Sequence, residues 1–374
     1  MGALKLTKSQ GNGRRLYMDT SPSSQPVRLG LVGAGYWGTQ VALAAALDPG
    51  VELVACYSRS PEAREAFAHR HGCRACTSYG EMLTDPAIQG IVVMSPNQAH
   101  RNHVEAAAAA GKHVLVTKPI ATTIEDGIAM IRACERAGVI LAVGHQSRRE
   151  PAIRRLRQLL AAGALGQPVM AEANISTGNG ILIRPEQWRW KRNECPGGPL
   201  IQLGIHHVDT LQYLLGPIVR VLGWQHRRYV PADIDDVTMT LLEFESGTSS
   251  YLGAGYASGQ ACWIKLYGTL AVAHYDQHLG LTLSHDTWEA GPARRQEAPG
   301  IPLQPPIPTM REEVCEFAEC LRTGKPPEID GWQALRNLAV VLAAVQSQQT
   351  GLAVAVEDLL SPRSEARPAS RHGI

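Results

Sequence analysis

The sequence lacks the features that mark several protein classes. No apolar run approaches the ~20 residues that span a bilayer, and residues 1–26, MGALKLTKSQGNGRRLYMDTSPSSQP, lack the apolar core of a signal peptide. There are only three phenylalanines, and the net charge of +2 is close to neutral. Nucleic-acid-binding proteins usually carry a basic excess, often with aromatic side chains that stack on bases. The sequence therefore predicts a cytoplasmic globular protein with neither a membrane span nor a nucleic-acid partner.

The eight cysteines are scattered along the chain and do not resemble a disulfide framework. One stretch, HRHGCRAC, brings His69, His71, Cys73 and Cys76 within the spacing of a zinc site. The same letters also fit the end of a helix, a turn at Gly72 and the start of a strand. The second interpretation agrees better with the surrounding pattern, so no metal site is predicted.

A chain of 374 residues is long enough for two domains, each with its own core. The polar, turn-rich ends, 1–26 and 361–374, are predicted to be disordered tails. Between them the pattern changes near Arg148. We expect one domain over 27–147 and a second over 148–360.

The first domain opens with the stretch VRLGLVGAGYWG, in which a β-rich run leads into Gly33, Gly35 and Gly38. A helical segment, TQVALAAALDPG, and a second strand, VELVACYS, follow. In this order the glycines indicate dinucleotide binding. Gly33 would permit the tight turn, Gly35 the approach of a pyrophosphate and Gly38 the close packing of helix on sheet. The helix N-terminus would add free N–H groups for the phosphates.

The end of the second strand indicates which dinucleotide is bound. A carboxylate there would hydrogen-bond the ribose 2′-hydroxyl of NAD. This chain instead has Ser58, Arg59 and Ser60, with Arg64 one turn later. Hydroxyl and guanidinium groups suit a 2′-phosphate, so NADP is favoured over NAD, although a solvated charge run at a helix start is the alternative.

Strands continue to alternate with helices as far as VILAVGHQ, which predicts a mostly parallel, doubly wound sheet. Ligands bind beyond the carboxyl ends of such strands. The residues at those ends are Ser95, Pro96, Asn97, Lys118, Pro119, His145 and Gln146. After Arg148 the pattern shifts to a basic helix and then to paired strands around Ser246-Gly247 and Gly268.

The stretch GGPLIQLGIHHVDTLQYLLG predicts a helix that ends at Gly216-Pro217. Leucines and valine recur at helical spacing on one side. On another side Gln202, His206, Asp209 and Tyr213 form a polar stripe. His207 points about 100° away from His206 around the helix, and we expect it to be a buried structural histidine.

Taken together, GAGYWG, SPNQAH, VTKPIA and GGPLIQLGIHHVD resemble the Gfo/Idh/MocA family of NAD(P)-dependent oxidoreductases over roughly residues 26–360. The resemblance implies an α/β protein with an N-terminal Rossmann domain and a C-terminal α+β domain built on a large, open, mostly antiparallel sheet. It also implies action on sugars, cyclitols or related polyols, and a homodimer or homotetramer. The sequence departs from the family in having Thr117 before Lys118, where a glutamate is usual, and Gln202 where an aspartate is common.

The resemblance and the strand ends together give a set of expected cofactor contacts. They are Gly33, Gly35, Tyr36, Trp37, Gly38, Ser58, Arg59, Ser60, Arg64, Ser95, Pro96, Asn97, His100, Lys118, Pro119 and Gln146.

Hydride transfer between a carbinol and a nicotinamide also requires proton exchange at the oxygen. His206 is predicted as the general acid/base and Lys118 as its electrostatic partner or relay, with Gln202 bonding a substrate hydroxyl. Asp209 would orient a histidine or a hydroxyl, or form an exposed helical salt bridge. Trp188, Arg189 and the Arg148-Arg149 pair are further substrate candidates. The pair would bind a carboxylate or phosphate, and a solvated helix start is the equal alternative. Two rival functions remain: a glycosidase or lyase that oxidises its substrate transiently, and an NAD(P)-binding sensor without catalysis.

Overall fold

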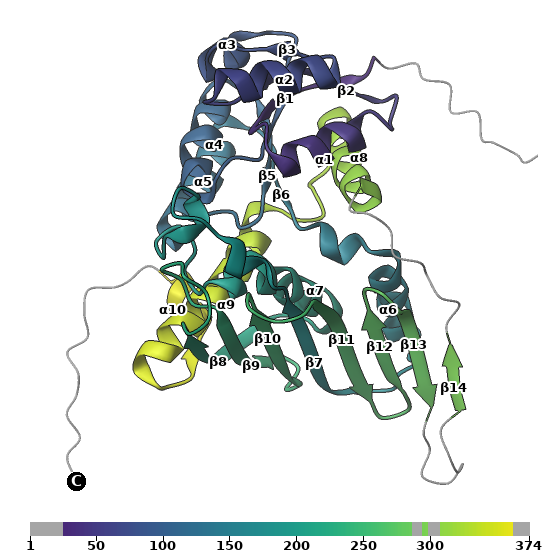
Figure 1. Cartoon of the computed structure of the whole chain (residues 1–374). Helices are drawn as coiled ribbons and strands as arrows, with labels where there is room; N and C mark the ends of the chain where they lie inside the picture. Colours follow the sequence, from purple (N-terminus) through teal and green to yellow (C-terminus); the bar gives the residue numbers. More distant parts are fainter. Residues whose placement is uncertain (1–24, 286–293, 298–306, 362–374) are drawn as a thin grey trace, which may run out of the picture.

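The computed structural model describes residues 25–285, 294–297 and 307–361, with backbone only for 294–297 and Ile307. The predicted tails at 1–24 and 362–374 lie outside these residues. Two sheets organise the molecule (Figure 1), a six-stranded one in the first half of the chain and a nine-stranded one in the second.

The first sheet is entirely parallel, in the order β3-β2-β1-β4-β5-β6. Its strands are apolar because helices cover both faces. The sheet is therefore the doubly wound Rossmann arrangement that was predicted, with its order reversing between β1 and β4. The strands are β1 (Val27–Val32), β2 (Val51–Tyr57), β3 (Arg74–Ala75), β4 (Gly90–Val93), β5 (His113–Thr117) and β6 (Leu141–Gly144).

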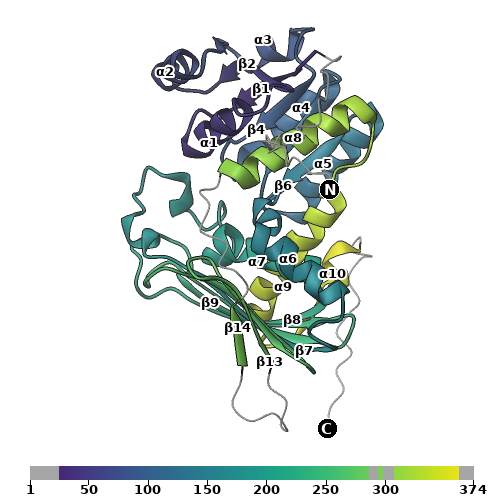
Figure 2. The same ribbon diagram turned by 90° about the vertical axis from the view of Figure 1, so that its right-hand side faces the viewer.

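The helices of the first half are α1 (Tyr36–Ala45), α2 (Pro61–His71), α3 (Tyr79–Thr84), α4 (His100–Ala109) and α5 (Ile124–Ala137). A further helix, α8 (Ile307–Thr323), comes from far along the chain and packs beside α1 (Figures 1 and 2). Its Phe317 is fully buried in one apolar cluster with Leu29 of β1, Val92 of β4 and Leu115 of β5. Helix α8 thus completes one face of the Rossmann sheet.

The nine-stranded sheet has the order β14-β13-β12-β11-β7-β10-β9-β8-β15, antiparallel except for the β7–β10 pair. This confirms the large, mostly antiparallel sheet, and Gly247 (φ +83°) forms the expected turn between β9 and β10. The strands are β7 (Pro168–Ser176), β8 (Ile218–His226), β9 (Val237–Phe244), β10 (Ser249–Gly255), β11 (Ala261–Gly268), β12 (Val272–Asp276), β13 (Gly280–His285), β14 (Arg294–Glu297) and β15 (Val354–Ala355).

Helices α6 (Pro151–Ala161), α7 (Ile205–Leu215) and α9 (Gly331–Thr350) lie between the two sheets, and α10 (Glu357–Leu360) follows at the end (Figure 2). Helix α9 packs on β8 and reaches α5 and β6 of the Rossmann half, as expected for the last long helix. In the described part of the chain, the other face of the large sheet carries no helix (Figure 2). In the second half of the molecule, helices therefore cover one face of the large sheet, and that face is turned toward the Rossmann half.

Around HRHGCRAC, helix α2 ends at His71, Gly72 takes the left-handed conformation (φ +67°) and β3 begins at Arg74. Among the described residues, no group of three or more His, Cys, Asp or Glu is arranged to hold a metal ion. Nor does any described helix combine the length and apolarity needed to cross a membrane.

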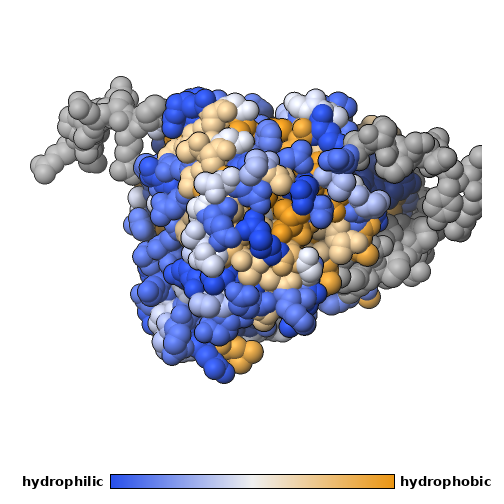
Figure 3. All heavy atoms as spheres, turned by 90° about the horizontal axis from the view of Figure 1, so that it is seen from above, coloured by the Kyte–Doolittle hydropathy of each residue, from blue (hydrophilic) through white to orange (hydrophobic). Residues whose placement is uncertain are grey.

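Seen from above, the Rossmann end has polar residues along its edges and apolar ones toward the middle (Figure 3).

Candidate active site

The glycine turn after β1 has the geometry that dinucleotide binding needs. Gly33 has φ +106°, and a side chain there would approach the carbonyl oxygen of Met94 to 2.5 Å. A Cβ on Gly38 would overlap the carbonyl oxygen of Gly33, so the start of α1 packs close to the strand. A Cβ on Gly35 would meet nothing within 4 Å. The turn therefore leaves open space at Gly35, where a pyrophosphate can approach the backbone.

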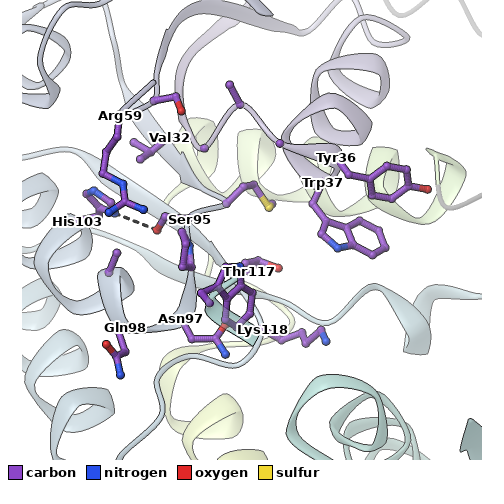
Figure 4. Close-up of a pocket in the computed structure, with 18 of the residues that line it drawn as sticks. Val32, Tyr36, Trp37, Arg59, Ser95, Asn97, Gln98, His103, Thr117 and Lys118 are labelled. Atoms are coloured by element: carbon purple, nitrogen blue, oxygen red, sulfur yellow. Dashed lines mark hydrogen bonds between the residues drawn. The ribbon is translucent and has the colours of Figure 1, made fainter. Parts of the chain in front are cut away.

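This open space belongs to a cavity of about 730 Å³ between the two halves of the molecule. Figure 4 shows Arg59 and His103 on one side of it and Tyr36 and Trp37 on the other, with Lys118 extending beyond Thr117. The predicted residues that line it are Gly33, Gly35, Tyr36, Trp37, Ser58, Arg59, Ser95, Pro96, Asn97, Lys118, Gln146, Trp188, Arg189 and Gln202. Residues from the ends of five strands (β1, β2, β4, β5 and β6) and from the second half thus meet at one cavity.

At the end of β2, Ser58 and Arg59 line the cavity, but Ser60 and Arg64 do not. The Ser60 hydroxyl caps α2 by accepting from the backbone N–H of Ala63 at 3.1 Å. Arg64 is buried and its Nη1 donates to the carbonyl oxygen of Ser58 at 3.3 Å. Arg59 is exposed and forms no ion pair within the described residues. The prediction that all four contact the cofactor is corrected: Ser60 and Arg64 shape the loop, and Ser58 and Arg59 face the ligand space.

Three other expected cofactor contacts also lie outside the cavity lining: Gly38, His100 and Pro119. The ring of His100 is fully buried, and its two nitrogens lie 3.0 Å from the carbonyl oxygens of Pro119 and Ser95. This histidine joins the loops that follow β4 and β5. Its position corrects the expectation of direct contact, since the ring holds these two loops together.

At the other end of the cavity, Lys118 meets the second half of the molecule. Its Nζ donates a hydrogen bond to the backbone carbonyl of Gln202. Gln202 lies in the π-helical turn Leu200–Gly204, which precedes α7 and was expected to be ordinary helix. The Gln202 side chain makes two contacts. Its Oε1 accepts from Nε of Arg189 at 3.4 Å, and its Nε2 donates to Sγ of Cys195 at 3.4 Å. Such turns are frequent at functional sites.

Lys118 is suited to proton exchange near neutral pH. Burial, together with the nearby positive charge of Arg189, lowers the pKa of Lys118 to about 7. A lysine with this pKa is present as both amine and ammonium at pH 7, so it can accept or release a proton.

His206 is buried beside Lys118, without itself lining the cavity. Burial lowers the pKa of His206 well below 6.5, and the charge of Lys118 adds to that effect. The Nδ1 of His206 is buried and has no hydrogen-bond partner within the described residues. The ring is thus neutral at pH 7 and has a free polar atom.

The neighbouring His207 is buried against the sheet, as predicted. Its Nε2 lies 3.1 Å from the carbonyl oxygen of Asn174 on β7. His207 therefore joins α7 to the large sheet and faces away from the Lys118 end of the cavity.

Farther along α7, the polar stripe faces the segment that joins the two halves. Asp209 is fully buried, so it does not form the exposed salt bridge considered as one alternative. It accepts from Nε of Arg148 at 2.7 Å and from Nδ2 of Asn337 at 2.8 Å. Tyr213 accepts from Nη1 of Arg154 at 3.0 Å. This part of the stripe is structural, and only its Gln202 end reaches the cavity.

Arg149 does not line the cavity either, which corrects its place among the substrate candidates. Its side chain is 3% exposed and its Nη2 lies 2.6 Å from Oε2 of Glu316 on α8. Carboxylates of Glu312 and Glu328 lie 3.4 and 3.3 Å from its Nη1. With Arg148 and Arg149 both paired, neither guanidinium remains for a substrate anion.

Several lining residues were not predicted: Val32, Ala34, Tyr57, Met94, Gln98, Ala99, Asn102, His103, Thr117, Glu194 and Met310. His103 lies about one helical turn beyond His100, and its Nδ1 is 3.0 Å from Oγ of Ser95. Helical spacing from the SPNQAH motif would have indicated it. Met310 comes from α8, and no local signal links that helix to the cavity.

The sequence is similar to known oxidoreductases along most of its length. Residues 27–145 match the family model described as "Oxidoreductase family, NAD-binding Rossmann fold", and residues 153–274 match the GFO/IDH/MocA C-terminal domain. The 1,5-anhydro-D-fructose reductase of Ensifer adhaerens is 28% identical over 88% of this chain and 98% of its own length. The D-apiose dehydrogenase of Paraburkholderia graminis is 28% identical over 88% of this chain and 89% of its own.

Among solved structures, a putative NADPH-dependent oxidoreductase from Desulfitobacterium hafniense is similar with a TM-score of 0.85. It is 31% identical, with 90% of this chain and all of that chain covered. The two family models together cover more than half of the sequence, and the hydrogen bond from Lys118 to Gln202 joins a residue of the first match to one of the second. The chain therefore belongs to the Gfo/Idh/MocA oxidoreductase family and is an NAD(P)-dependent oxidoreductase.

Proposed function

We propose that this protein transfers a hydride between NADP and a secondary alcohol or ketone of a sugar, cyclitol or related polyol. The observation that carries the proposal is the single cavity that runs from the glycine turn and Arg59 to Lys118 and Gln202. The relatives that act on anhydrofructose and apiose support a sugar-like substrate. When bound, the nicotinamide supplies the hydride acceptor or donor.

The residues around Lys118 would manage the proton. In alcohol oxidation, the neutral amine of Lys118 takes the hydroxyl proton, and in ketone reduction its ammonium returns it. His206 is neutral, its charge is disfavoured by that of Lys118, and its buried Nδ1 has no hydrogen-bond partner among the described residues. We therefore propose Lys118, which lines the cavity, as the acid/base and His206 as its partner, the reverse of the roles expected from the sequence. Gln202, held by Arg189 and Cys195, would bond a neighbouring hydroxyl.

Activity on a panel of aldoses and polyols tests this function. Incubation with NADP⁺ should give NADPH in step with a ketone or lactone product, followed by nicotinamide absorbance and chromatography. If the cofactor stays unconsumed while product forms, a glycosidase or lyase cycle explains the protein better. If the cofactor binds but no sugar or polyol reacts in either direction, the protein is better described as a sensor.

The cofactor preference gives a separate prediction. NADP should bind more tightly than NAD, because Arg59 has a free guanidinium beside Ser58 at the end of β2. Ser58→Asp should reverse the order, since the carboxylate repels the 2′-phosphate and accepts from the 2′-hydroxyl. A charge-assisted contact contributes about 1.5–3 kcal/mol, so the ratio of the two Kd values should shift by at least about tenfold. Calorimetry measures both constants.

Arg59→Gln should weaken NADP binding selectively, and Arg70→Gln is the matched control. Arg70 is exposed at the end of α2, outside the cavity lining. An unmodified protein that binds NAD more tightly than NADP would contradict the preference.

We also propose a homodimer or homotetramer that packs through the free face of the large sheet. Trp224 and Met239 are paired across β8 and β9, and Leu241 follows on the same face. These side chains are 47%, 45% and 47% exposed, and neighbouring exposed apolar side chains of this size are typical of a surface that a partner covers. Leu241→Glu should lower the mass seen by light scattering to that of one chain. A monomeric unmodified protein at micromolar concentration would refute the assembly.

A further inference from the structure

Arg189 is the guanidinium that remains available at the Lys118 end of the cavity. It lines the cavity, and its Cζ lies 4.3 Å from the ring centroid of Trp188. Its Nε makes the 3.4 Å contact with Oε1 of Gln202. Within the described residues it has no carboxylate partner, unlike Arg148 and Arg149, which are paired with buried or half-buried acids. A guanidinium has five N–H donors, so most of those of Arg189 remain free.

The charges around Arg189 are unbalanced. Lys118 and Arg189 line the same end of the cavity, and Arg189 helps to lower the pKa of Lys118. Gln202, which lies between them, is an amide and cannot supply negative charge. Thr117, before Lys118, is likewise uncharged. Among the described residues, no carboxylate lies between Arg189 and Lys118, so the guanidinium has no negative partner there, nor has Lys118 in its ammonium form.

Among the described residues, Glu194 is the one acid that lines the cavity, and its carboxylate forms no ion pair with Lys118 or Arg189. Burial raises the pKa of Glu194, and the cations that lower it are Lys191 and Arg59. Arg59 belongs to the cavity end formed by β2, where the 2′-phosphate is expected. The carboxylate of Glu194 therefore interacts with cations near the cofactor end of the cavity. The guanidinium of Arg189, beside Lys118, is left without a carboxylate and can bind an anionic ligand.

We propose that the substrate is an acidic sugar derivative, a uronic or aldonic acid, whose carboxylate is bound by the guanidinium of Arg189. This inference rests on the proposed function and names its substrate class. The planar fork of a guanidinium matches a carboxylate through two parallel hydrogen bonds. Stacking on Trp188 fixes the plane of the fork, while Lys118 stays free for the proton. The carboxylate takes no part in the redox step and sets the orientation of the reacting carbinol.

The test uses the full-length protein with NADP⁺ and matched substrate pairs, such as D-glucose with D-glucuronate and D-galactose with D-galacturonate, extended to aldonic acids. For at least one pair, the acid should have the higher kcat/KM, by about tenfold or more. Arg189→Gln should remove that preference, with a loss of about 10- to 100-fold on the acid, the range expected for a charge-assisted hydrogen bond. Arg189→Lys keeps the charge without the fork and should retain part of the preference.

Arg184→Gln is the matched control, because Arg184 is exposed on the same segment and lies outside the cavity lining. The preference should be unchanged in this variant. A preference for neutral sugars or sugar phosphates throughout the panel overturns the proposal, as does an acid preference that survives in Arg189→Gln.

The two proposals fail in different ways. Turnover of neutral sugars alone leaves the oxidoreductase function intact and removes the carboxylate site. If no sugar is turned over, the redox function fails, and calorimetry of the acids on NADP-loaded protein decides the second question. Binding that disappears in Arg189→Gln supports the carboxylate site, and the absence of binding by every acid rejects it.

Discussion

Lys118→Met should lower kcat/KM for alcohol oxidation by about 1,000-fold or more. The variant loses both the group that exchanges the proton and the charge beside the developing alkoxide, and positioned proton transfer alone contributes about 100- to 10,000-fold.

The unmodified enzyme should also show the titration of Lys118 in its pH dependence. With a pKa of about 7, the amine is neutral at higher pH, so oxidation should rise as pH increases through 7, and reduction should fall.

Steady-state rates over a pH series measure both effects. Lys118→Met should lack the limb near pH 7, while Lys325→Met, at an exposed lysine outside the cavity lining, should keep it. If the Lys118 variant keeps the same limb, another group titrates and the proposed proton exchange is wrong.

His206→Ala should lower turnover by about 100-fold or more, with little change in the Kd for NADP. The phosphates are bound at the glycine turn, whereas His206 lies beside Lys118, where its buried Nδ1 lacks a partner among the described residues. Combined with Lys118→Met, the loss should be less than additive, because the two groups serve one proton transfer. Turnover and calorimetric affinity of the two single variants and the double variant measure this.

His207→Ala is the neighbouring control. That histidine bonds the carbonyl oxygen of Asn174, so its loss should lower the melting temperature and leave most of the turnover. A His206 variant that stays active while the His207 variant loses activity would show that the wrong face of α7 was chosen.

The Rossmann half was predictable because its rules are local. Buried parallel strands are continuous apolar runs, and each glycine of the turn has a distinct steric reason visible in the sequence order. The hairpins of the large sheet were predictable for a similar reason, since Gly247 and Gly268 lie between alternating segments. Lys118 and Gln202 could be brought together only through the family resemblance, because 84 residues separate them.

The residues that were expected to contact ligands but do not line the cavity share a physical cause. The type of a residue does not show whether its side chain binds a ligand or another group of the protein. Arg64, His100 and Arg149 have the chemistry of ligand contacts, but each is buried on a group supplied by the protein. Arg149 is paired with carboxylates more than 160 positions away. Arg189 has the same chemistry, but its contacts are the amide of Gln202 and the ring of Trp188, and it has no carboxylate partner among the described residues. The decision between structural and functional arginines thus depended on long-range packing.

The order of synthesis gives α8 a further significance. The ribosome makes all six strands of the Rossmann sheet long before α8, whose Phe317 packs with Leu29 and Leu115. Until residues up to Thr323 have left the exit tunnel, the nascent sheet exposes the apolar face that α8 covers. The nucleotide-binding half therefore completes its core only near the end of translation. A gene fragment that stops near residue 147 encodes a sheet on which the part of that face covered by α8 stays exposed beside α1, which makes it a target for chaperones and for aggregation.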